Sequence, residues 1–133
     1  MPRVPVPPEI DAFLARPNPA VVATVSPRGT PHSAATWYDW EGGRVLLNMD
    51  ASRLRLHYLR ESPAVALTVL AAESWYRQVT LLGRAVAIVE DPDLHDIDRL
   101  SVRYTGRPFE NRQAHRVSAW IEPERWSAWP LPE

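Results

Sequence analysis

The chain has 133 residues, a length that suits one domain with one sizeable core. Its formal net charge of −1 argues against bulk nucleic-acid binding and against a polybasic membrane patch. Cysteine is absent, which excludes disulfides, a thiolate nucleophile and a cysteine-based zinc site. No apolar run is long enough to span a bilayer, and the proline-rich N-terminus lacks a signal-type apolar core, so we expect a cytoplasmic protein.

The first third of the chain predicts an extended arm, a short helix and three strands. Residues 1–7 form the arm, and a helix with proline at its start follows over residues 8–14. Alternating and β-branched residues, separated by Gly- and Pro-containing turns, predict strands over 20–25, 30–40 and 44–49.

The segment after the third strand combines a strand end with an arginine-bearing helix start. Asp50 and Ser52 break the strand and can cap a helix over residues 52–60, whose first turn carries Arg53 and Arg55. A helix start favours an anion, and arginine offers a planar fork of donors that matches phosphate. Spacing alone leaves two interpretations, a phosphate site or a capped surface helix with solvated arginines.

The remainder of the chain predicts further strands and one more helix. Strands are expected over 64–70 and 75–90, with Gly83 as a bend or bulge in the longer one. Asp91 and Pro92 open a helix that Gly106 closes, a strand follows over 116–122, and residues 126–131 form an aromatic tail. About six strands without βαβ alternation indicate a small antiparallel barrel in a single domain over residues 1–133.

Common catalytic motifs are absent from the sequence. No pair among the four histidines has the spacing of a helical metal site, so we expect no metal. A strand with small residues at Ser33, Ala34, Ala35 and Thr36 would let a flat ring lie close to the backbone, although ordinary barrel packing also uses small residues. Four aromatic residues fit two interpretations equally well, as walls of a ring pocket or as core or dimer anchors: Trp37, Trp40, Trp75 and Tyr76.

Three ordered stretches between residues 13 and 90 carry a family resemblance: FLARPNPAVVATVSPRGTPHSAATWYDWEGGRVLLN, SRLRLHYLRESPAVALTV and YRQVTLLGRAVAI. Together they resemble the flavin/deazaflavin oxidoreductase superfamily, which includes pyridoxamine-phosphate-oxidase-like proteins, and above all its branch of coenzyme F420-dependent enzymes. The resemblance implies a six-stranded antiparallel split β-barrel of Greek-key type with two to three short helices. It also implies a homodimer with the cofactor in a groove between the subunits.

The same resemblance implies which residues bind the cofactor. The strand over 31–37 lies beside the ring in the family, and an Arg-x-Lys pattern at the following helix start holds the phosphate. Here that pattern is Arg53-Leu54-Arg55, with arginine where lysine is usual. The implied cofactor-binding set is His32, Ser33, Ala34, Ala35, Thr36, Trp37, Asn48, Met49, Ser52, Arg53, Arg55, Trp75 and Tyr76.

The implied activity is hydride transfer from reduced coenzyme F420, a deazaflavin, to an unsaturated or aromatic small molecule. The alternatives are an FMN-dependent oxidase or reductase of the same fold, a noncatalytic cofactor-binding dimer, and a haem-binding split barrel. The expected partners are a second copy of the chain and a small-molecule substrate, with no nucleic acid and no membrane. A proton could come from Tyr38, His32, Tyr76 or solvent, and no catalytic residue is assigned.

Overall fold

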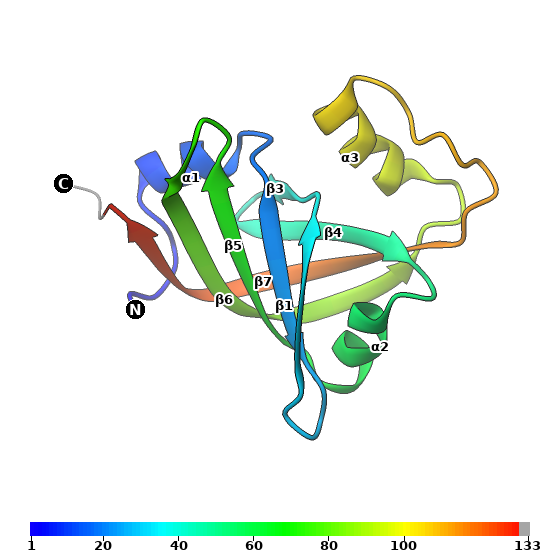
Figure 1. The fold of residues 1–133 in the computed structure, drawn as a ribbon, viewed down its shortest axis with the longest axis horizontal. Helices are drawn as coiled ribbons and strands as arrows, with labels where there is room; N and C mark the ends of the chain where they lie inside the picture. The colour runs from blue at the N-terminus through cyan, green and yellow to red at the C-terminus, as the bar shows by residue number, and fades with distance from the viewer. Residues whose placement is uncertain (131–133) are drawn as a thin grey trace.

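The computed structural model describes residues 1–130. Within this range the chain forms three helices and a single antiparallel sheet of seven strands, in the order β2-β1-β5-β6-β7-β4-β3 (Figure 1). The elements are α1 (Pro8–Leu14), β1 (Ala20–Val25), β2 (Pro31–Thr36), β3 (Asp39–Glu41), β4 (Arg44–Asp50), α2 (Leu54–Glu61), β5 (Ala64–Ala71), β6 (Ser74–Glu90), α3 (His95–Thr105) and β7 (Arg116–Trp129). No helix among these residues is long and apolar enough to cross a membrane.

The predicted antiparallel, mainly β architecture with three helices is confirmed, but the described residues form seven strands and not six. The single strand expected over residues 30–40 is two strands, because the backbone leaves the sheet at Trp37 and Tyr38. Tyr38 is fully buried, and its hydroxyl donates to the carbonyl oxygen of Leu14 at 2.7 Å. Burying the Tyr38 side chain with its hydroxyl hydrogen-bonded is favoured over continuing the strand pairing, so the strand ends here.

This two-residue break joins opposite edges of the sheet. β2 pairs with β1 at one edge, whereas β3 pairs with β4 at the other, and only Trp37 and Tyr38 lie between them. Two residues span less than about 11 Å even when extended, so the sheet must curl until its edges nearly meet. The result is a barrel with a gap between its two edge strands, which we call the seam.

The longest strand bends at Gly83, as predicted. β6 pairs with β5 up to Arg84 and with β7 along almost its whole length, and the register with β7 shifts between Leu82 and Gly83. A Cβ atom at Gly83 would lie 2.2 Å from the backbone oxygen of Glu122. The bend therefore depends on glycine at this position, because β7 approaches too closely for any side chain.

Three predicted boundaries are wrong, each for a local reason. α2 begins at Leu54 with Arg53 as its N-cap, while the Asp50 carboxylate binds the N–H and hydroxyl of Ser52. α3 begins at His95 and not at Pro92, because a turn from Asp91 to Leu94 precedes it. The expected aromatic tail continues strand β7 as far as Trp129, and Leu131 lies outside the described residues.

The inside of the barrel is filled by one apolar core. It includes Phe13 and Leu14 of α1, Leu56 and Leu59 of α2, and inward residues of every long strand. A second, smaller cluster of Leu94, Ile97 and Leu100 lies beneath α3, and Trp37 and Phe109 pack against it. Residues 2–4 run beside the end of β7, since backbone bonds join Val4 to Glu124 and Trp126 to Pro2.

The close approach of the β7 backbone to Gly83 predicts that a side chain at this position destabilises the protein. Gly83→Ala places its Cβ against the Glu122 carbonyl, so we expect the free energy of unfolding to fall by about 1–3 kcal/mol. The control is Gly43→Asn, at a position with φ +78° and nothing within 4 Å of a built Cβ, where asparagine tolerates the backbone. Denaturant titration of both variants is the measurement, and equal stabilities would show that β7 does not crowd Gly83.

Candidate functional site

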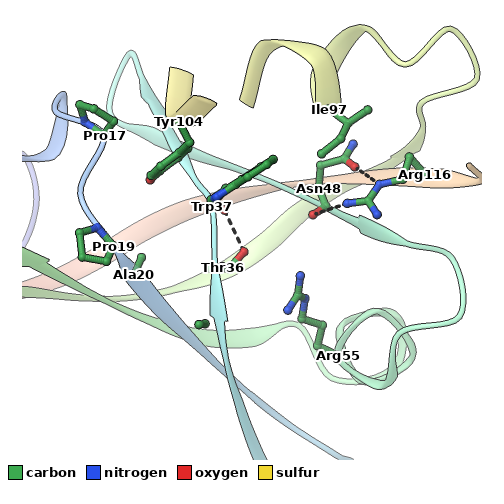
Figure 2. Close-up of a pocket in the computed structure, with 11 residues that line it drawn as sticks. Pro17, Pro19, Ala20, Thr36, Trp37, Asn48, Arg55, Ile97, Tyr104 and Arg116 are labelled. Carbon is green, nitrogen blue, oxygen red and sulfur yellow. Dashed lines mark hydrogen bonds between the residues drawn. The ribbon is translucent and has the colours of Figure 1, made fainter. Parts of the chain in front are cut away.

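A pocket of about 480 Å³ lies where the seam continues past the short strand β3, between β2 on one side and β4 and β7 on the other. Figure 2 shows its side chains converging from β2, β4, β7, α2, α3 and the loop before β1. Its lining residues are Pro17, Pro19, Ala20, Ala35, Thr36, Trp37, Asn48, Arg55, Ile97, Tyr104 and Arg116.

One end of the pocket is flat and apolar. Trp37 and Tyr104 are stacked, with ring centroids 5.5 Å apart and an interplanar angle of 7°. The Tyr104 hydroxyl donates to the Asn18 carbonyl at 2.7 Å, which fixes the pair against the loop that carries Pro17 and Pro19. Rigid, flat walls of this kind suit a planar ring system.

The opposite end is positively charged. Arg55 projects from the first turn of α2, is half-buried, and its buried Nε atom has no hydrogen-bond partner among residues 1–130. Burial lowers the pKa of its guanidinium, and the neighbouring charges of Arg53 and Arg116 lower it further. A buried cation with an unused donor and two cationic neighbours is what an anion site requires in the absence of its ligand.

Asn48 and Arg116 complete this charged end. The Nε atom of Arg116 donates to Oδ1 of Asn48 at 2.9 Å, and the amide nitrogen of Asn48 donates to Asp91 at 3.1 Å and Ser118 at 3.0 Å. Burial lowers the pKa of the Arg116 guanidinium, whereas the nearby Asp50 carboxylate opposes that shift. The ring of Phe109 lies 4.9 Å from the Arg116 guanidinium carbon.

The structure brings five of the predicted site residues to this pocket: Ala35, Thr36, Trp37, Asn48 and Arg55. Ser52 and Arg53 lie beside it at the start of α2, where both are exposed. Arg53 therefore acts on the pocket through its charge.

The other predicted site residues lie elsewhere. His32, Ser33 and Ala34 belong to β2 but do not line the pocket, and Met49 is fully buried in the barrel core. Trp75 and Tyr76 are stacked on each other at the start of β6, with ring centroids 4.6 Å apart. Figure 1 shows the hairpin between β5 and β6 on the side of the molecule away from α2.

Sequence reasoning missed Arg116, Tyr104, Ile97, Ala20 and the two prolines of the pocket. Tyr104 and Ile97 follow helical spacing in the sequence of α3, a pattern that indicates burial and not a pocket. Arg116 reaches the site through the register of β4 and β7, which pairs it with Asp50. The candidate proton donor Tyr38 is excluded from the pocket by its burial.

The arrangement fits an anionic ligand with a planar ring. Within residues 1–130 no group of three His, Asp or Glu side chains is placed to hold a metal ion. What the pocket offers is the free edge of β2, flat apolar walls at one end and arginines at the other.

Comparisons with known proteins agree with this description. The family model described as pyridoxamine 5'-phosphate oxidase matches residues 6–130. The solved structure of an F420 reductase is 30% identical, with a TM-score of 0.82, and the alignment covers 92% of this chain and 98% of that one. A conserved hypothetical protein from Mycobacterium tuberculosis is 27% identical, with a TM-score of 0.71 and coverages of 98% and 91%.

A more distant structure shares the fold alone. General Stress Protein 26 from Bacillus anthracis is 20% identical, with a TM-score of 0.67 and coverage of 90% of each chain. No curated protein is significantly similar to the chain in sequence.

The unpartnered state of Arg55 predicts an unusual stability effect. Arg55→Met removes a buried charge that repels Arg53 and Arg116, so we expect the melting temperature of the ligand-free protein to stay the same or rise.

The matched control is Arg103→Met, since Arg103 is also partly buried but donates to the carbonyls of Ala15, Arg16 and Tyr38 and pairs with Asp39. Its loss should lower the free energy of unfolding by about 2–4 kcal/mol. A similar loss in Arg55→Met would mean that Arg55 is a structural residue.

Proposed function

Because the chain belongs to the pyridoxamine 5'-phosphate oxidase family, we propose that it is an oxidoreductase that binds a phosphorylated flavin-type cofactor in the seam pocket, with coenzyme F420 as the preferred cofactor. The observation that carries this proposal is the guanidinium of Arg55, which is partly buried beside Arg53 and Arg116 and has no acidic partner among residues 1–130. A phosphate would satisfy its free donor and offset the repulsion among the three charges.

The likeness to the F420 reductase supports the deazaflavin over FMN. That protein is 30% identical over nearly the whole of both chains. FMN is the alternative, because its phosphate and its ring make the same demands on this pocket. A dimer that binds cofactor without turnover is the second alternative, and it would show a sound binding site with no acceptor reduced.

The residues of the pocket fit such a cofactor. Arg55, with Arg53 nearby, would hold the phosphate, and the walls formed by Trp37, Tyr104 and the prolines would hold the ring. β2 is an edge strand, so backbone N–H and C=O groups on its free side can read the rim of a ring. The cofactor supplies hydride chemistry when bound.

The chain's own contribution is to bind, orient and exclude water. The stacked Trp37–Tyr104 pair and the anchored Tyr104 hydroxyl keep the ring wall rigid, and rigid walls hold two reactants in a productive geometry. The proposed acceptor is an unsaturated or aromatic small molecule, since a flat acceptor can stack on a flat ring.

The test of the cofactor is a fluorescence titration of purified protein with coenzyme F420, beside an identical titration with FMN. We expect tighter binding of F420, and we expect Arg55→Ala to weaken it by roughly 1–3 kcal/mol, the scale of a lost charge-assisted hydrogen bond. Arg44→Ala, an exposed arginine paired with Glu122, is the control and should bind like wild type. Preference for FMN would select the flavin alternative, and absence of binding by both would refute the function.

We also propose that the protein is a homodimer. Trp75, Tyr76 and Trp129 are 68%, 67% and 61% exposed, and the pairing of Gln78 with Trp129 brings the three to the same end of the sheet. Exposed aromatic clusters of this kind mark association surfaces.

Light scattering at micromolar concentration should therefore give the mass of two chains, and Trp75→Ser combined with Tyr76→Ser should shift the equilibrium toward monomer. Val102→Ser, which removes a single exposed apolar residue on α3, should remain dimeric. A monomeric wild-type protein would contradict the proposal.

A further inference from the structure

Arg116 has the features of a ligand-binding residue, although the sequence around it does not predict a binding site. It is the first residue of β7, is half-buried, and lines the charged end of the pocket. Figure 2 shows its guanidinium and that of Arg55 turned toward the same space from opposite sides. The two arginines come from different elements, α2 and β7, so together they would bind an anion from two directions.

The orientation of Arg116 is set by Asn48. The amide nitrogen of Asn48 has two acceptors, Asp91 and Ser118, so both of its N–H donors are used. Its oxygen must therefore face Arg116, whose Nε donates to it at 2.9 Å and whose Nη2 reaches the Asn48 carbonyl at 3.4 Å. Asn48 is 4% exposed and has no N–H left for a ligand.

The acceptors of Asn48 are fixed in turn. The Ser118 hydroxyl donates to Asp96 at 2.6 Å, so it can only accept from Asn48. The Asp91 carboxylate also accepts the backbone N–H groups of Asp96 and Ile97 at the start of α3. These hydrogen bonds allow the Asn48 amide only one orientation, with its oxygen toward Arg116. The amide oxygen in turn fixes the direction in which the Arg116 guanidinium points.

The far side of the Arg116 guanidinium remains available. Within residues 1–130 its Nη1 atom makes no hydrogen bond. The nearby Asp50 carboxylate attracts the Arg116 charge without a direct hydrogen bond, and its Oδ1 accepts from the N–H and hydroxyl of Ser52. Arginine binds phosphate best when its fork is held in place, because less conformational entropy is then lost on binding.

We infer that Arg116 is a second phosphate-binding residue, which holds the anion from the side opposite Arg55, and that Asn48 is a positioning residue that aims it. This inference rests on the proposed function, because it concerns the phosphate end of the same pocket. It assigns Asn48 a role that acts through Arg116 and not through contact with the cofactor.

The test compares phosphorylated cofactors with their phosphate-free forms. FMN is titrated beside riboflavin, and coenzyme F420 beside its phosphate-free deazaflavin analogue, with wild type, Arg116→Gln and the control Arg44→Gln. We expect Arg116→Gln to weaken the phosphorylated forms by about tenfold or more and to leave the phosphate-free forms unchanged. Equal weakening of both forms would show a structural role and overturn the inference.

Inorganic phosphate separates this inference from the proposed function. Added to the cofactor-free protein, it should raise the melting temperature of wild type and of Arg44→Gln, and raise that of Arg116→Gln much less. If neither cofactor binds, the proposed function fails, and this comparison still decides the role of Arg116. An equal rise in Arg116→Gln and wild type would overturn it.

The role of Asn48 is tested by a double-mutant cycle. Asn48→Ala should weaken binding of the phosphorylated cofactor in the presence of Arg116 and add no further loss in the Arg116→Gln background. If Asn48→Ala does not fold, Ser118→Ala replaces it, since it removes one of the two acceptors that orient the amide. Additive losses would mean that Asn48 does not act through Arg116.

Discussion

The structure depends on the two residues that join opposite edges of its sheet. β2 and β3 are the edge strands, and the chain passes from one to the other through Trp37 and Tyr38 alone. This short connection forces the sheet to curl, yet among residues 1–130 no pairing joins the two edges, and Tyr38 turns into the core between them. The pocket lies along that gap, so the feature that shapes the barrel also creates the site.

A buried hydrogen-bond network then fixes α3 against the open side of the barrel. Asp91 receives the first N–H groups of α3 and the amide of Asn48 on β4, while Ser118 on β7 connects Asn48 to Asp96. At its other end α3 is held by Arg103, which binds the carbonyls that end α1. With both ends tied, α3 holds Ile97 and Tyr104 in the pocket wall. The positions of these wall residues thus derive from polar contacts whose side chains, apart from that of Asn48, do not line the pocket.

Local signals predicted part of this arrangement. The first part of the strand expected over 30–40, the bend at Gly83 and the arginines at the start of α2 each depend on residues close in sequence, and each is present. The break at Trp37 could not be predicted, because it results from competition between strand pairing and the burial of Tyr38 against α1. Arg116 could not be predicted either, since its place depends on the register between β4 and β7, 66 residues apart at Asp50 and Arg116.

Two partly buried arginines, Arg103 and Arg55, differ in whether the fold itself uses their charge. Arg103 is surrounded by carbonyl oxygens and the Asp39 carboxylate, so its charge is used within the fold. Arg55 is partly buried near two other cations, and its Nε lacks an acceptor among residues 1–130. Folding alone gives no reason to keep an uncompensated charge in a half-buried position, because desolvation and repulsion both oppose it. Such a residue is retained most simply if a ligand supplies the missing negative charge, and the flat apolar end of the same pocket indicates that this ligand also carries a ring.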